Sequence, residues 1–324
     1  MRHLLSLFDL SQQELHTVLS LAQQIKELLE KGQRPAWLER RVLAMLFEKP
    51  SLRTRVSFEA GMCQLGGSAM FLGEEVGWQS RESTADFVRV LAEYADYVVC
   101  RAKCHQSVVE LARHNCLPII NGLTDHLHPC QALADILTMR QHTRSLAGSQ
   151  VTFVGDGNNV ARSLAIGCAM VGVRFRLLGP ADYFISQPYV EEIYTRYPNA
   201  DFSQTSDFAA GLREADFIYT DVWTSMGQEA ESQTRREAFG KFQLNSKLLS
   251  LAPRECKILH CLPARRGEEI TDDVMDCPNS LVVEQAGNRM HAQKGLLVWL
   301  ALQHGQLSAS DLLSAGIELP LGIS

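Results

Sequence analysis

Long apolar runs are missing from this sequence, and none approaches the ~20 residues that a helix needs to cross a bilayer. The first residues, MRHLLSLFDLSQQELH, place acidic and amide side chains in a helical rhythm. They lack the basic start, apolar centre and small-residue cleavage site of a signal peptide. The sequence therefore predicts a cytoplasmic protein with no membrane partner.

Positive charge is also scarce. The chain has 31 lysines and arginines against 37 aspartates and glutamates, for a formal net charge of -6. This balance argues against general affinity for nucleic acids, so no nucleic-acid partner is expected. Any strong anion site must depend on a local cluster of donors and cations.

Cysteine is present without a disulfide pattern. The 9 cysteines are odd in number and scattered, which gives no paired framework and suits a reducing cytosol. Cys100, Cys104 and His105 resemble a set of metal ligands, but no second ligand pair follows at the spacing of a zinc site. The sequence therefore predicts no metal site.

The length of 324 residues, with 46% of them hydrophobic, suits two domains of about 150 residues each. Apolar strand-like segments alternate with amphipathic segments, which predicts α/β domains, each a parallel sheet flanked by helices. We expect one domain at 1–148 and another at 149–287, with a C-terminal helix at about 288–324 that packs back onto the first. In such folds the default site is the interdomain cleft.

Most elements can be placed from periodicity and capping residues. Strands are expected at 41–49, 68–73, 97–102, 117–123, 151–157, 174–180, 216–223 and 257–263. Helices are expected at 10–32, 53–67, 81–95, 106–115, 128–143, 159–172, 189–197, 208–215 and 288–305. The polar segment QEAESQTRREAFGKFQ is interpreted as a mobile surface loop.

The segment FEKPSLRTRVSFEAG gathers hydroxyl and guanidinium groups behind a proline. Pro50 suits the start of a helix. The free N–H groups of Ser51 to Thr54 would then form an anion site at the positive end of the helix dipole. Ser51 and Thr54 add hydroxyl groups, and Arg53 adds a planar fork for phosphate. Arg55 faces elsewhere and suits a salt bridge or a subunit contact. A capped helix with solvated arginines is the alternative.

The segment HPCQALADI starts a second helix. A helix that begins at Pro129 places His128 and Gln131 on one side near its N-terminus. A neutral imidazole and an amide both can donate to a carbonyl oxygen as it gains negative charge. The alternative is a capping or core histidine, and Cys130 is interpreted as a core residue.

The segment FVGDGNNVARSL has two glycines, Gly155 and Gly157, after a strand. The third glycine of a dinucleotide loop is replaced by Val160, so the fingerprint of a nicotinamide-binding protein is incomplete. Asn158 and Asn159 instead suit hydrogen bonds to the carboxylate or amine of an amino acid.

Three later motifs end strands or lie on a helix. DVWTSMG places Asp221 at the end of a strand, where α/β proteins bind ligands. HCLPARRG places Cys261 at another strand end, where it could share a substrate amine with Asp221, although a free cysteine is more often a small core residue. NRMHAQKG places Arg289 at the start of the last long helix.

The motifs SLRT, HPCQ, GDGNN, DVWTSMG, HCLP and NRMHAQK, in this order over residues 47–294, resemble the aspartate/ornithine carbamoyltransferase family. The combination of DxxxSMG and HCLP is similar to the ornithine branch. The resemblance implies an enzyme that makes citrulline and phosphate from carbamoyl phosphate and ornithine, with no metal or organic cofactor. It also implies a homotrimer or a multiple of trimers, with active sites near subunit boundaries.

The resemblance assigns roles residue by residue. Carbamoyl phosphate is expected to bind to Ser51, Leu52, Arg53, Thr54, Arg101, His128, Gln131, Cys261, Leu262 and Arg289. Ornithine is expected to bind to Asn159, Asp221, Ser225 and Met226. Among these, the catalytic residues implied are Arg53, Arg101, His128, Gln131 and Cys261. His128 and Gln131 would polarise the carbamoyl carbonyl, and the ornithine δ-amine would attack its carbon.

A departure from the family pattern leaves alternatives open. Leu52 stands where the family most often has threonine, and SLRT resembles branches that act on N-acylated ornithine, so an N-acylornithine carbamoyltransferase is the nearest alternative. A nicotinamide-dependent oxidoreductase built on GDGNN and a non-catalytic regulatory subunit are more distant ones. The segment GWQSRES is expected to cross to a neighbouring subunit, where Gln79 or Arg81 would reach the phosphate.

Overall fold

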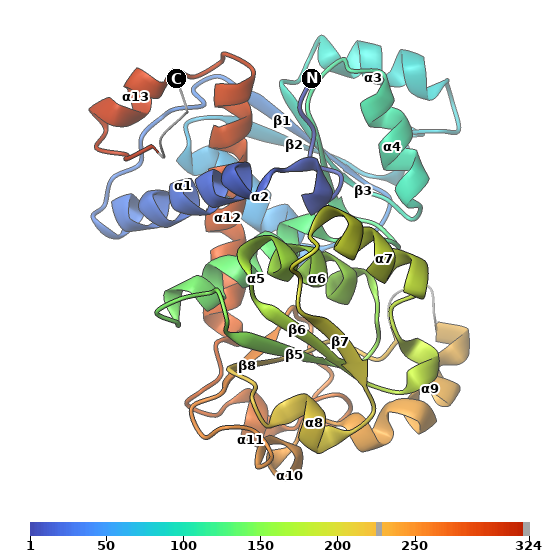
Figure 1. Ribbon diagram of the computed structural model, residues 1–324. Helices are drawn as coiled ribbons and strands as arrows, with labels where there is room; N and C mark the ends of the chain where they lie inside the picture. The colour runs from blue at the N-terminus through green and yellow to red at the C-terminus, as the bar shows by residue number, and fades with distance from the viewer. Residues whose placement is uncertain (225–228, 320–324) are drawn as a thin grey trace. The chain divides into compact units, whose positions relative to one another are not determined.

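The computed structural model describes residues 1–224 and 229–319. The chain divides into two compact units, one formed by Met1–Leu137 with Gly287–Ser324 and the other by Thr138–Ala286. Each unit contains one parallel sheet flanked by helices (Figure 1), which confirms the predicted fold class. In the described part of the chain, no helix is both long enough and apolar enough to span a membrane.

The first unit contains a four-stranded sheet in the order β2-β1-β3-β4. Its strands are β1 (Val42–Phe47), β2 (Ser68–Leu72), β3 (Tyr97–Arg101) and β4 (Ile119–Leu123). Its helical elements are η1 (Leu7–Asp9), α1 (Gln12–Glu30), α2 (Leu52–Gln64), η2 (Glu74–Val76), α3 (Thr84–Ala92), α4 (His105–Arg113), most of α5 (Pro129–Gln141), most of α12 (Val282–Gln303) and α13 (Ala309–Ser314).

Alternate residues of β1 and β3 build one of the cores of this unit. Ala44, Leu46, Val98 and Cys100 pack in one cluster with apolar residues of α3 and α4, which lie beside one another (Figure 1). Because the strands are parallel, their carboxyl ends meet at one edge, where Phe47 pairs with Arg101. The segment that follows β1 and the end of β3 are therefore neighbours.

The second unit contains a five-stranded sheet in the order β7-β6-β5-β8-β9. Its strands are β5 (Gln150–Val154), β6 (Arg174–Leu178), β7 (Phe202–Thr205), β8 (Phe217–Thr220) and β9 (Lys257–His260). Its helical elements are α6 (Asn159–Val171), η3 (Ala181–Tyr183), α7 (Gln187–Arg196), α8 (Phe208–Leu212), η4 (Glu229–Glu231), α9 (Ser232–Phe239), η5 (Gly240–Phe242), α10 (Ser246–Leu249) and α11 (Asp272–Met275).

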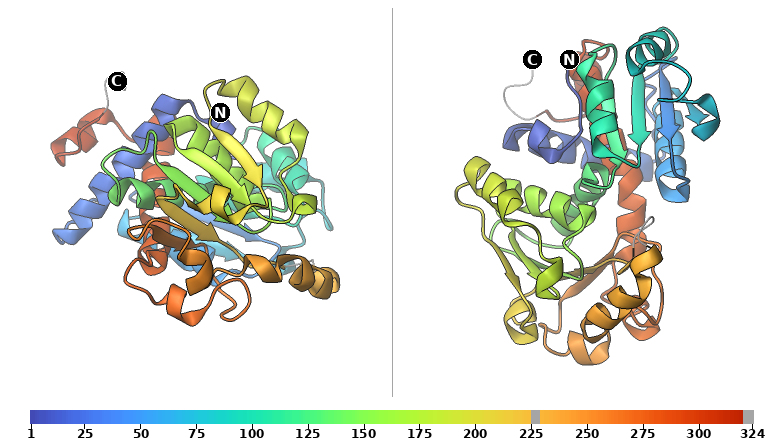
Figure 2. Two further views of the ribbon diagram at one scale, coloured as in Figure 1. Left: turned by 60° about the horizontal axis from the view of Figure 1, so that its bottom comes forward. Right: turned by 90° about the vertical axis from the view of Figure 1, so that its right-hand side faces the viewer.

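The helices of this unit cover both faces of its sheet. In Figures 1 and 2, α6 and α7 lie on one side and α8, α10 and α11 on the other. At the carboxyl edge Val154 pairs with Thr220, and Thr220 pairs with His260. The loops that follow β5, β8 and β9 therefore start side by side.

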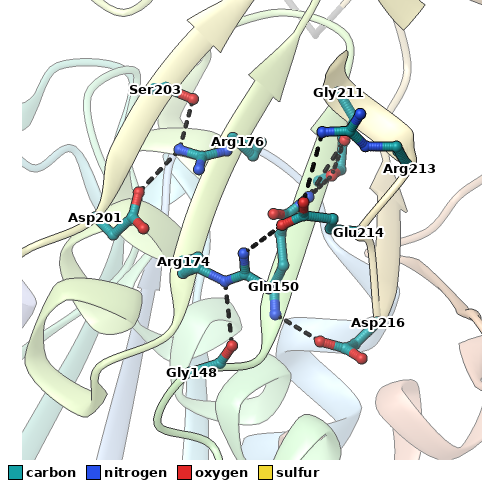
Figure 3. Close-up of polar contacts among 11 residues, drawn as sticks. Gly148, Gln150, Arg174, Arg176, Asp201, Ser203, Gly211, Arg213, Glu214 and Asp216 are labelled. Atoms are coloured by element: carbon teal, nitrogen blue, oxygen red, sulfur yellow. Dashed lines mark hydrogen bonds and ion pairs between the residues drawn. The ribbon is translucent and has the colours of Figure 1, made fainter. Parts of the chain in front are cut away.

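The amino ends of these strands carry a surface network of polar contacts (Figure 3). Arg174 donates to Glu214 at 2.6 Å, and Arg176 donates to Asp201 at 2.9 Å. The backbone N–H of Gln150 donates to Asp216 at 2.8 Å. Exposed pairs of this kind contribute about 0–1 kcal/mol each, so they align strand ends more than they stabilise the unit.

Two expectations about the elements are wrong, and one strand was not predicted. The segment interpreted as a mobile loop contains α9, because the buried Arg235 forms an ion pair with Asp156 at 2.7 Å and Phe239 is fully buried. The last long helix begins at Val282, six residues before the expected start. The sequence analysis also missed β7, whose residues FSQT are only partly buried and carry little apolar signal.

Candidate active site

The N-terminus of α2 lies directly behind Pro50. Ser51 is the N-cap of this helix, and its hydroxyl oxygen accepts the N–H of Thr54 at 3.3 Å. The helix thus begins at Leu52, two residues later than a proline at the first helical position would place it. Since Ser51 uses the N–H of Thr54, the expectation that this N–H is open is wrong, and those of Leu52 and Arg53 remain at the open end of the helix.

Arg101 ends β3 at the edge where α2 begins. Its side chain is buried, and its Nε has no hydrogen-bond partner among the described residues. Burial lowers the pKa of Arg101 to about 10, with further contributions from Arg289 and Arg53. In the described part of the chain, neither Arg53 nor Arg101 forms an ion pair with a carboxylate. Three cations gathered in this way are destabilising unless an anion binds among them.

Arg289 connects this cluster to the residues of the second predicted helix. Arg289 lies well inside α12, so the expectation that it lies at a helix N-terminus is wrong. Its side chain, rather than the end of a helix, contributes the positive charge. Its Nη2 donates to the hydroxyl oxygen of Thr54 at 2.9 Å, and its Nη1 donates to the amide oxygen of Gln131. The same Nη1 lies 3.5 Å from Nε2 of His128.

The amide of Gln131 is held at both ends. Its nitrogen donates to Oδ1 of Asp135 at 2.8 Å, and its oxygen accepts from Arg289. The amide oxygen of Gln131 is therefore directed to the cation cluster. The amide nitrogen was expected to polarise a carbonyl, but one of its two N–H groups is used by Asp135. Asp135 is fully buried one turn further along α5. The sequence analysis did not select it, although its i, i+4 spacing from Gln131 was a usable signal.

His128 directly precedes α5, which begins at Pro129 as predicted. Burial lowers the pKa of His128 well below its ordinary value, and Arg289 and Arg101 lower it further. The imidazole is therefore neutral at physiological pH. A neutral imidazole can hydrogen-bond a ligand without adding charge to a cluster that already contains three cations.

Asp221, the residue after β8, organises the corresponding edge of the second unit. Its Oδ1 accepts from the thiol of Cys261 at 2.9 Å, and its Oδ2 accepts from the side-chain amide of Asn158 at 2.9 Å. Asn158 is also the N-cap of α6, with its oxygen accepting two backbone N–H groups. The neighbour of the predicted Asn159 therefore contacts Asp221, and capping geometry was the signal for it.

Two of the predicted ornithine residues, Ser225 and Met226, lie outside the described residues. Asn159 is the first residue of α6. Cys261 is partly buried beside Asp221, and Leu262 has a φ of 58°, the left-handed region that bulky residues rarely adopt. Such a backbone conformation is more frequent at functional sites than elsewhere.

Asp221, His260 and Cys261 place one potential metal ligand each within 4.8 Å of the others. The imidazole of His260 is already used on both sides. Its Nδ1 accepts the N–H of Leu262 at 2.9 Å, and its Nε2 lies 2.9 Å from Oε1 of Glu269. Neither ring nitrogen has a lone pair available for a metal, so these residues do not form a suitable metal site.

The segment expected to reach a neighbouring subunit lies beyond β2. Gln79 and Arg81 are exposed, and Gln79 has a φ of 64°. Gly77 also lies in the left-handed region, with a φ of 71°. Trp78, within the same segment, is buried in the core of the first unit. The contact of this segment with a neighbouring subunit stays a prediction.

Family models match both parts of the chain. The model of the carbamoyl-P binding domain of aspartate/ornithine carbamoyltransferase matches residues 2–141, and that of the Asp/Orn binding domain matches residues 147–300. The chain belongs to the aspartate/ornithine carbamoyltransferase family. The resemblance inferred from the six motifs is thereby confirmed, and the chain is a transferase.

Relatives within the carbamoyltransferase family are similar over nearly their whole length. The ornithine carbamoyltransferase of Anoxybacillus flavithermus is 46% identical over 91% of this chain and 95% of that protein. That of Bacillus subtilis is 45% identical over 91% of this chain and 92% of that protein. The solved structure of the ornithine carbamoyltransferase from Pyrococcus furiosus is similar to this one with a TM-score of 0.88 and 43% identity, over 92% of this chain and 96% of that chain.

Proposed function

We propose that this chain is an ornithine carbamoyltransferase, which transfers the carbamoyl group of carbamoyl phosphate to the δ-amine of L-ornithine and releases citrulline and phosphate. The similar proteins described above all carry this name. The observation that carries the proposal is the cluster of Arg53, Arg101 and Arg289 at the N-terminus of α2. This cluster suits a dianionic leaving group.

Carbamoyl phosphate is bound by the first unit. The phosphoryl oxygens accept from the backbone N–H groups at the start of α2 and from the guanidinium groups of Arg53 and Arg101. The neutral imidazole of His128 and the guanidinium of Arg289 donate to the carbamoyl oxygen. The amide oxygen of Gln131, fixed by Asp135, accepts from the carbamoyl NH₂ group, so its role differs from the one the resemblance implied.

Ornithine is bound by the second unit, through Asp221, Asn159, Ser225 and Met226. The neutral δ-amine attacks the carbamoyl carbon, forms the new C–N bond and creates a tetrahedral oxyanion. The C–O bond to phosphate then breaks, and the attacking nitrogen loses a proton. Donors already placed around the carbamoyl oxygen are worth about 10²–10³ in rate each, and joining two substrates supplies much of the remainder. This chemistry needs no metal or organic cofactor.

Cys261 and Leu262 line the position of the reacting carbon. The thiol of Cys261 donates to Asp221 in the ligand-free protein. A substrate amine can take the place of this thiol proton as the partner of the carboxylate. Asp221 thereby serves as a fixed acceptor for ornithine, and Cys261 controls which amine approaches it.

We further propose a homotrimer, in which the segment of residues 77–83 reaches a neighbouring phosphate site. An exposed apolar patch on α2 and the edge strand β2 supports an interface there. It consists of Leu52, Val56 and Phe71, with Arg55 stacked 4.2 Å above the Phe71 ring. Arg55 also pairs with Glu59 at 3.5 Å, consistent with the predicted salt bridge. The 9 cysteines are all free thiols, which suits a reducing compartment such as the cytoplasm.

A citrulline assay with carbamoyl phosphate and four amines tests the function. The amines are L-ornithine, N-acetylornithine, putrescine and aspartate. We expect product with ornithine alone. N-acetylornithine has no free α-amino group for Asp221, putrescine has no α-carboxylate, and aspartate has no δ-amine to attack the carbamoyl carbon. Activity with N-acetylornithine in place of ornithine would transfer the chain to the acylornithine branch, and activity with aspartate alone would refute the ornithine assignment.

A further inference from the structure

The turn after β9 is folded around the imidazole ring of His260, the last residue of that strand. The Nδ1 of His260 accepts the backbone N–H of Leu262 at 2.9 Å. The Nε2 on the opposite side of the ring lies 2.9 Å from Oε1 of Glu269, and both side chains are fully buried. An acceptor at Nδ1 and a carboxylate at Nε2 are compatible with one neutral tautomer, in which the proton is on Nε2.

Further contacts fix the two ends of this arrangement. The backbone N–H of His260 donates to the side chain of Gln285 at 2.8 Å. Oε1 of Glu269 also accepts the backbone N–H of Arg265 at 2.6 Å. The imidazole is thus held between a strand end and a buried carboxylate. The backbone of residues 260–265 is therefore fixed by its hydrogen bonds to His260 and Glu269.

The residue that the ring holds has an unfavourable backbone conformation. Leu262 has a φ of 58°, which its side chain disfavours, so the turn needs a compensating interaction to keep this shape. The hydrogen bond from its N–H to His260 supplies one. Cys261, which lies between these two residues, directs its thiol to Asp221 at 2.9 Å. The ring therefore constrains the residues on both sides of the thiol.

We propose that His260 and Glu269 are positioning residues for the reacting centre. Glu269 fixes the tautomer of His260, whose Nδ1 then holds Leu262 and aims the Cys261 thiol at Asp221. The proposal rests on the proposed function in one respect, namely that Cys261 and Leu262 line the site of carbamoyl transfer. Neither positioning residue needs to contact a substrate.

Two substitutions at one position separate the two sides of the ring. In His260→Asn, the amide oxygen takes the place of Nδ1 and accepts from Leu262, but the contact with Glu269 is lost. In His260→Gln, the longer amide reaches the place of Nε2 and donates to Glu269, but Leu262 loses its acceptor. If His260 and Glu269 had only a structural role, His260→Gln would reduce activity less than His260→Asn, because glutamine keeps the buried carboxylate paired and is closer in size to histidine. If they position the reacting centre, His260→Asn would reduce activity less, because asparagine keeps the acceptor for the N–H of Leu262.

We expect kcat with ornithine to fall about tenfold or more in His260→Gln and by about threefold or less in His260→Asn, since loss of one hydrogen bond corresponds to roughly a factor of ten. Thermal unfolding should show the opposite order, with Asn the less stable protein. An equal loss of kcat in both variants, or the larger loss in Asn, would overturn the proposal.

A second measurement does not depend on catalysis. Alkylation by iodoacetamide is followed at each cysteine by peptide mass spectrometry on the folded protein. We expect the rate at Cys261 to rise about tenfold in His260→Gln, because the thiol is released from Asp221, and to stay near the wild-type rate in His260→Asn. The exposed Cys63 and the buried Cys256 are internal controls, expected to react at unchanged rates.

The two readouts distinguish the possible failures. A wild-type protein that makes no citrulline contradicts the proposed function, while the alkylation rates still test the turn. A wild-type protein that is active, with an unchanged Cys261 rate and unchanged kcat in His260→Gln, contradicts the positioning role. Should His260→Asn fail to fold, His260→Gln alone decides the question by these same values.

Discussion

Replacing Arg101 by methionine should make the ligand-free protein more stable and weaken its response to phosphate. Arg101 is buried near two other guanidinium groups, and burial lowers its pKa to about 10, well below the ordinary value of an arginine. Since each pKa unit corresponds to 1.36 kcal/mol, the charged side chain costs the folded protein about 3 kcal/mol. Methionine removes this charge and retains most of the apolar volume.

We therefore expect the free energy of unfolding to rise by roughly 1–3 kcal/mol in ligand-free Arg101→Met, in line with other apolar replacements of buried charges. For a unit of this size that corresponds to a Tm about 2–4 °C higher per kcal/mol. Phosphate at a hundred times its Kd should stabilise the wild type by about 2.7 kcal/mol, and the variant much less. Citrulline formation by the variant should be lost.

Differential scanning calorimetry with and without phosphate measures both effects. Arg89→Met is the matched control, because Arg89 lies in the same unit, on α3, but is exposed and paired with Asp86 at 3.6 Å. It should leave both the Tm and the response to phosphate unchanged. The reasoning would be refuted if Arg101→Met lowered the Tm of the ligand-free protein, or if phosphate raised the Tm of variant and wild type equally.

Four further predictions follow from the same geometry. Arg53→Ala should lower kcat/KM for carbamoyl phosphate by about 10²-fold or more in steady-state assays, and a change below threefold would exclude a phosphate contact. Asp135→Leu should lower kcat about tenfold with folding retained, because it frees the Gln131 amide to rotate; an unchanged kcat would show that the amide needs no support. Cys261→Ser should change kcat or KM for ornithine while KM for carbamoyl phosphate stays constant, and the converse pattern would contradict its position. Burial lowers the pKa of His128, so below about pH 6.5 the unfolded state binds a proton that the folded state does not, and the free energy of unfolding should fall as the pH drops. In urea titrations, His128→Asn should remove up to about 1.4 kcal/mol of this loss per pH unit. An unaltered slope would mean that the imidazole is protonated in the folded protein.

The sequence was sufficient for features that depend on local patterns. The alternation of strand-like and helical segments predicted the two parallel sheets, and the helix expected at 10–32 is α1 (Gln12–Glu30). The motif residues fall at the carboxyl edges of the strands because parallel pairing brings those ends together. The sequence indicates that the strands are parallel, but it does not indicate which residues pair, such as Phe47 with Arg101.

Features that depend on tertiary partners were not predictable in the same way. The helix α9 was interpreted as a polar loop because one of its two buried residues is Arg235, whose charge is matched by Asp156 from a distant part of the chain. Asp135 and Glu269 looked like ordinary polar residues until their buried partners were known. A single sequence shows which side chains can bond, and the fold decides which of them do.

The most direct test of this account is a crystal structure of the protein with carbamoyl phosphate or a stable phosphonate analogue. The account predicts that the phosphoryl group is held by the N–H groups at the start of α2 and by Arg53 and Arg101, with Arg289 at the carbamoyl oxygen. Phosphoryl density elsewhere, or none at these guanidinium groups under saturating conditions, would contradict it.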